Sequence, residues 1–100
     1  MNEESRYHRA MRAVWERSYL EYRRWSDTKR ETVQPGLEAL LAWLSDAANE
    51  TDLVSRYVEI GDAPGNILRP HLPTGFDEDD ILVLEEAALC LRMLVLRSER

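Results

Sequence analysis

The strongest fold signal lies in residues 81–96, which read ILVLEEAALCLRMLVL. Placed on a helix at about 100° per residue, the apolar side chains cover almost the whole circumference, and only Glu85, Glu86 and Arg92 interrupt them. A helix that is apolar nearly all round must be buried nearly all round. The segment therefore predicts an all-α fold, a compact bundle of three to four helices with the helix at about residues 79–98 as its central element.

Acidic residues mark the start of this helix. Residues 77–80 read DEDD, and carboxylates near a helix N-terminus are stabilised by the helix dipole, with Asp77 as the candidate cap. A calcium loop needs alternating oxygen ligands and a late Glu over about twelve positions, and this run lacks that spacing. Helix capping is therefore the better interpretation, and no metal is predicted.

Two longer helices are expected upstream. Residues 3–25 carry one apolar wedge at helical spacing, and residues 35–49 form a second amphipathic segment that begins with Pro35, a residue suited to a first helical turn. Residues 26–34 are expected to be a polar link. Leu20 lies opposite the wedge. The wedge consists of Tyr7, Met11, Val14, Trp15, Ser18, Tyr22 and Trp25.

A short helix is expected at residues 52–59. Leu53, Val54, Tyr57 and Val58 share one helical face, but Val, Tyr and Ile also favour extended structure, so helix and strand stay open for residues 53–60. We favour the helix, because no second convincing strand exists to pair with it.

Residues 61–76 are expected to be a long loop, because they hold three of the four Gly and three of the four Pro. Long loops without their own structure are often functional, which would make Asn66, Arg69 and His71 partner-binding residues. The alternative is a loop that closes the core. That alternative rests on four apolar residues: Ile67, Leu68, Leu72 and Phe76.

Composition limits the class of protein. One hundred residues predict one domain, residues 1–100. The single cysteine, Cys90, permits no internal disulfide, which favours a reducing cytoplasm. Residues 1–6 hold no apolar run typical of a secretory signal, and residues 81–96 are too short and too charged to span a bilayer.

Charge is unevenly distributed along the chain. The net charge is −6, but residues 32–91 hold two basic and twelve acidic side chains, a local net charge of −10. Residues 1–31 hold eight basic and six acidic side chains, a local net charge of +2. An acidic middle disfavours general attraction to nucleic acid or anionic lipid and favours a partner protein with a basic surface.

Catalytic motifs are missing from the sequence. His8 and His71 have no ligand neighbour at a zinc-binding spacing, and Cys90 lies in the apolar segment, where a small buried hydrophobe is the usual role. No phosphate-binding glycine motif or nucleophile elbow occurs. The chain is therefore expected to be neither an enzyme nor a cofactor-binding protein, although a reactive Cys90 or His71 would reverse that expectation.

Binding and assembly remain as the expected function. The chain is interpreted as a cytoplasmic protein–protein interaction module that regulates, inhibits or assembles a larger partner. If its own helices do not cover the apolar segment, Leu82, Leu89 and Met93 would bind a partner or a second copy, giving a homodimer. The alternative is nucleic-acid binding through Arg9, Arg12 and Arg23 on the first helix.

Overall fold

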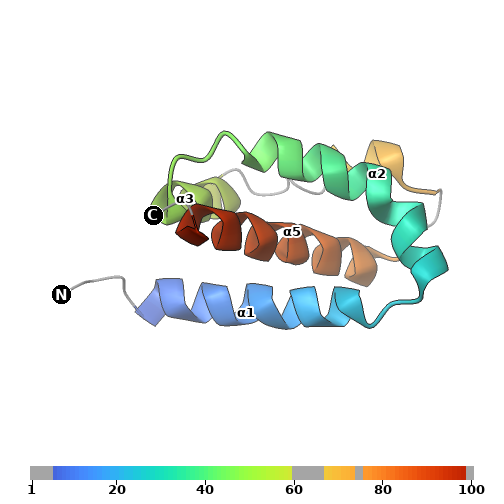
Figure 1. Ribbon diagram of the computed structural model, residues 1–100, viewed down its shortest axis with the longest axis horizontal. Helices are drawn as coiled ribbons and strands as arrows, with labels where there is room; N and C mark the ends of the chain where they lie inside the picture. The colour runs from blue at the N-terminus through green and yellow to red at the C-terminus, as the bar shows by residue number, and fades with distance from the viewer. Residues whose placement is uncertain (1–5, 60–66, 74–75, 99–100) are drawn as a thin grey trace.

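A computed structural model describes residues 6–59, 67–73 and 76–98, with side chains described from residue 9 to 56 in the first range (Figure 1). The described residues form an all-α bundle, as the sequence predicts, and contain no strand. The strand alternative for residues 53–60 is therefore wrong for residues 53–59, and Ile60 lies outside the described residues. The helices are α1 (Arg6–Arg23), α2 (Asp27–Leu44), α3 (Glu50–Glu59) and α5 (Glu78–Ser98), with a 3-10 turn η1 (Arg69–His71).

Helix α5 lies between α1 and α2 and also contacts α3 (Figure 1). Every residue from Val83 to Met93 is buried or half-buried within the single chain. The large apolar side chains of α5 that remain exposed, Leu82, Leu94 and Val95, lie toward its two ends. The middle of α5 therefore needs no second copy to cover it.

Helix α1 packs along α5, and the wedge residues whose side chains the structure describes are buried or half-buried. Trp15 is fully buried, whereas Leu20, on the opposite side, is 54% exposed. Ser18 donates a hydrogen bond of 2.7 Å from its hydroxyl to the carboxylate of Glu86, which is only 8% exposed. Burying a carboxylate without a polar partner would be costly, so this bond across the interface stabilises the buried Glu86.

Helix α2 corrects the predicted boundaries. It begins at Asp27, eight positions before Pro35, and ends at Leu44 rather than near residue 49. Ser26 has the extended backbone of a helix N-cap, and its Oγ accepts a hydrogen bond of 3.1 Å from the Lys29 N–H. Residues 27–34 are therefore the first two turns of a helix rather than a polar link, because a capped start outweighs the proline signal.

Pro35 lies inside α2, where its ring leaves the Glu31 carbonyl without its usual helical donor. The ribbon changes direction between the cyan first turns of α2 and its green remainder, as expected for an interior proline (Figure 1). Gly36 follows, and a Cβ there would lie 3.3 Å from Leu68 Cδ2 and 3.4 Å from His71 Cβ. A glycine at this position lets η1 approach α2 closely.

The segment expected to be a loop is in part helical, since Ile67 and Leu68 lead into η1. Leu68 is fully buried, and the predicted loop packs on the core through three half-buried residues, which are Ile67, Leu72 and Phe76. This arrangement follows the core-closing alternative for the part of residues 61–76 that the structure describes.

Arginine side chains of α1 and α5 join α3 and the end of α2 to the rest of the bundle. The Arg92 guanidinium donates hydrogen bonds to the Ser45 and Ala47 carbonyls at 3.1 Å and 3.3 Å, where α2 has ended. Glu50, the first residue of α3, contacts Arg12 of α1 at 3.3 Å and Arg97 of α5 at 3.4 Å. These guanidinium groups fix how α3 sits against α1 and α5.

Candidate binding groove

The predicted loop site is not assembled in the described residues. Arg69 and His71 are exposed, and Asn66 lies outside the described residues. Arg69 forms an ion pair of 2.9 Å with Glu78 at the start of α5, and its charge is thereby matched. His71 places its Cβ against Gly36. The two described residues therefore hold η1 in place more than they present a joint surface.

The predicted partner residues on α5 separate into two groups. Leu89 is 0% exposed and Met93 is 1% exposed, so both lie in the core of the single chain. Leu82 is 46% exposed and lies on the surface. Of the three, only Leu82 is open to a partner in this structure.

The predicted nucleic-acid residues on α1 do not form a row of free cations. Arg9 is exposed, Arg12 is paired with Glu50, and Arg23 places its guanidinium carbon 5.9 Å from the centre of the Tyr19 ring. Glu16 follows Arg12 by four positions and precedes Arg23 by seven, so a carboxylate lies within the same side of the helix. This charge pattern gives no specific support to phosphate binding.

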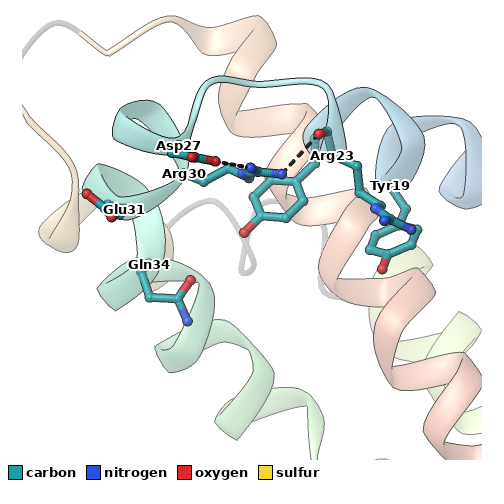
Figure 2. Close-up of a pocket in the computed structure, with 7 residues that line it drawn as sticks. Tyr19, Arg23, Asp27, Arg30, Glu31 and Gln34 are labelled. Atoms are coloured by element: carbon teal, nitrogen blue, oxygen red, sulfur yellow. Dashed lines mark hydrogen bonds and ion pairs between the residues drawn. The ribbon is translucent and has the colours of Figure 1, made fainter.

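A groove of about 620 Å³ lies instead at the corner where α1 ends and α2 begins (Figure 2). Its volume falls within the range of small-ligand sites in proteins. One wall comes from the last two turns of α1 and the other from the first two turns of α2. The lining residues are Tyr19, Tyr22, Arg23, Asp27, Arg30, Glu31 and Gln34.

Arg30 builds the corner. Its guanidinium donates a hydrogen bond of 3.0 Å to the Arg23 carbonyl at the end of α1 and forms an ion pair with Asp27 in the first turn of α2 (Figure 2). One side chain thus satisfies a terminal carbonyl of one helix and neutralises a carboxylate of the next. The two walls of the groove are held together by these bonds.

Lys29 ties the same corner to α5. Its ammonium lies 4.1 Å from the centre of the Trp25 ring and forms an ion pair of 2.8 Å with Asp80. The Trp25 ring in turn meets Tyr22 edge to face, with 5.6 Å between the ring centres. This chain of contacts runs from α5 through the turn to the groove, and it positions Tyr22 by packing rather than by a hydrogen bond.

Two opposite charges in the groove are left without an ion pair. Among the described residues, neither the Arg23 guanidinium nor the Glu31 carboxylate forms a salt bridge, while Arg30 and Asp27 neutralise one another. Figure 2 shows Glu31 and Gln34 on one side, with Tyr19 and Arg23 on the other. Gln34 donates its amide to Glu38 at 2.9 Å, which leaves its carbonyl oxygen as a free acceptor. The groove therefore offers a cation, an anion and neutral hydrogen-bonding groups.

This groove is not predicted from the sequence, because four of its seven lining residues lie in the segment expected to be a link. Helical periodicity places Tyr22 in the core wedge, and Arg23 is one of the residues that the nucleic-acid alternative predicts. The signal that could have found the α2 wall is Ser26 followed by Asp27, an N-cap residue and an acidic first-turn residue. The Arg30 contact with the Arg23 carbonyl has no sequence signature.

Other chemistry finds little support in the described part of the chain. Within residues 6–59, 67–73 and 76–98, no group of three or more His, Cys, Asp or Glu side chains is arranged to hold a metal ion. None of the described helices is both long and apolar enough to cross a membrane. Burial first, and the Glu16 carboxylate second, raise the pKa of the Cys90 thiol above its usual 9.0, although Arg97 lowers it.

Comparisons with known proteins give no functional guide. No family model matches the sequence, no curated protein matches it, and no solved structure matches it. The groove and the surface charge therefore carry the functional argument.

Proposed function

We propose that this chain is a cytoplasmic protein-binding module, and not an enzyme, that regulates, inhibits or assembles a larger partner through the corner groove. The observation that carries the proposal is the open groove lined by two half-buried tyrosines and two arginines. Tyr and Arg are the residue types that concentrate in the energetically dominant parts of protein interfaces. Both walls are helices, which hold a binding surface with little loss of conformational entropy.

Surface charge supports a partner with basic groups. Glu31 and Glu38 are exposed along α2, and Asp77 and Asp79 are exposed where α5 begins. The ion pair between Lys29 and Asp80 brings the first turns of these two helices together. An acidic rim beside the groove would speed the encounter with a basic partner and exclude acidic ones.

A substitution that fills the groove tests the proposal. Gln34→Trp places a large ring in the groove at an exposed position, so the fold is expected to persist. Affinity capture from the native host, quantified by mass spectrometry, is expected to enrich a partner with the wild-type chain and to recover it at least about tenfold less with the variant, as for a lost interface hot spot.

The matched control is Ala42→Trp, which adds the same ring at an exposed position of α2 outside the groove lining. This control is expected to capture the partner as the wild-type chain does. Equal loss with both variants would point to general surface damage. Equal capture by Gln34→Trp and the wild-type chain would remove the groove as the binding surface.

A further inference from the structure

We infer that the groove binds a short mixed-charge segment of its partner protein, with a carboxylate of that segment against Arg23 and a basic side chain against Glu31. This inference rests on the proposed function and adds to it the chemistry of the bound segment. The groove presents one cation from α1 and one anion from α2, and each lacks an ion pair among the described residues.

The α1 side suits a carboxylate. Arg23 is exposed and its guanidinium is placed over the Tyr19 ring, with 5.9 Å from its central carbon to the ring centre. A cation–π contact of this kind holds the guanidinium near the ring while leaving its N–H groups free. A planar fork of N–H donors held in this way matches the two oxygens of a carboxylate.

The α2 side suits a basic side chain. Glu31 is exposed on the wall opposite Arg23, and the neighbouring positive charge of Arg30 is already matched by Asp27 (Figure 2). Glu38, two turns further along α2, adds a second carboxylate outside the groove. A cation on this side therefore meets a net negative field.

The backbone distance from Arg23 to Glu31 limits the length of the segment. Four residue steps, at most about 14 Å, separate Arg23 from Asp27, and the next helical turn adds about 6 Å to reach Glu31. An extended chain rises about 3.3 Å per residue, so a segment of up to about six residues spans this distance. The half-buried Tyr22 ring and the free Gln34 carbonyl also line the groove, where they can meet an apolar side chain and a backbone N–H.

Four synthetic peptides test the inference. The probe is acetyl-Glu-Ala-Tyr-Ala-Arg-amide, and its three relatives carry Gln in place of Glu, of Arg, or of both. Binding to the full chain is measured by NMR titration of the backbone amides of residues 19–34. The mixed-charge peptide is expected to bind about twofold to fivefold tighter than either single-charge peptide, the range that an exposed ion pair supports.

Protein variants then assign each charge to its partner. Arg23→Gln is expected to weaken the probe about twofold to fivefold and to cause no further loss when the peptide Glu is already Gln. Glu31→Gln is expected to behave in the same way with the peptide Arg. Arg17→Gln on α1 and Asp46→Asn just after α2 remove exposed charges outside the groove lining and are expected to leave every affinity unchanged.

The outcomes separate the inference from the proposed function. Two results would overturn the mixed-charge inference and leave the groove as a binding surface. In the first, the groove amides shift equally with all four peptides. In the second, the loss of affinity from a protein variant is the same whether or not the peptide still carries the matching charge. No shift of the groove amides with any of the four peptides would overturn the inference. If the Gln34→Trp capture also equals the wild type, the proposed function falls with it.

Discussion

The α1–α5 interface and the α1–α2 corner use the same helix in opposite ways. Along α5, α1 buries Trp15 completely and encloses the Ser18–Glu86 hydrogen bond. At the corner, α1 meets α2 through Arg30 and leaves a groove whose charged groups face outward. A closed apolar interface holds the fold, while the open polar corner is the region that we propose for binding. The two regions should therefore respond very differently to substitution.

Truncation in the closed interface has the largest expected effect. Leu89 lies three positions after Glu86 and four before Met93, so it shares the side of α5 that faces α1. Leu89→Ala is expected to lower the free energy of unfolding by about 2–5 kcal/mol, because the chain around it cannot fully collapse into the cavity. Urea unfolding followed by circular dichroism measures the loss.

Leu82→Ala on the same helix is the matched control. It removes the same atoms from a side chain that is 46% exposed, so a loss under about 1 kcal/mol is expected. Equal losses for the two variants would contradict the described packing of α5.

Straightening α2 has the next largest expected effect. Pro35→Ala restores a donor for the Glu31 carbonyl and is expected to raise the free energy of unfolding by about 1–2 kcal/mol, less than the full helix penalty of proline because the unfolded chain also gains freedom. The control is Pro70→Ala, since Pro70 occupies the first turn of η1, where a proline carries no such penalty.

If Pro35→Ala leaves the free energy of unfolding unchanged or lowers it, Pro35 does not interrupt a helix. The boundary predicted from the sequence, with a helix that begins at residue 35, would then be the correct one. The same variant sharpens the comparison of the two regions, because the first turns of α2 form one wall of the groove. Their redirection is expected to weaken peptide binding while the α1–α5 interface stays intact.

The two regions also differ in how far the sequence predicts them. The helix expected at residues 79–98 is observed at Glu78–Ser98, because acidic residues, a long apolar run and a late Arg all mark it. The first two turns of α2 bury one apolar residue, Val33, so periodicity is silent there and Pro35 dominates the prediction. The α1–α2 corner could not be predicted from the sequence, because a contact between the two helices, from Arg30 to the Arg23 carbonyl, creates it.

Loosening the corner has a smaller expected effect. Lys29→Gln removes both the ion pair with Asp80 and the contact with the Trp25 ring, and is expected to cost about 1 kcal/mol of stability, since both interactions are partly exposed. Lys29→Arg keeps the charge and is the control. If both variants lose the same stability, shape rather than charge holds the corner.

The buried thiol of Cys90 on α5 is expected to make the stability of the closed region depend on pH. Because the folded-state pKa of its thiol is raised above 9.0, its contribution to stability is complete below pH 9 and is lost as the pH rises through the folded-state pKa. The stability gap between the wild type and Cys90→Ala is therefore expected to be constant from pH 6 to 8 and to narrow above pH 9. Rapid reaction of the folded thiol with a disulfide reagent at pH 7 would contradict this burial.

The smallest expected effect is on molar mass, which should not change with concentration. The nearly continuous apolar circumference of α5 predicts a homodimer, but the single chain already covers residues 83–93. The exposed Leu82 and Leu94 lie twelve positions apart, about 18 Å along the helix, so they do not join into one patch.

A stable interface buries about 800 Å² on each partner, more than such separated side chains provide. Light scattering is therefore expected to give the monomer mass of 11.7 kDa across a concentration series. A mass near twice that value would show that the ends of α5 bind a second copy. Leu82→Asp and Leu94→Asp would then identify which end does so, and the groove at the α1–α2 corner would be tested separately with the peptides.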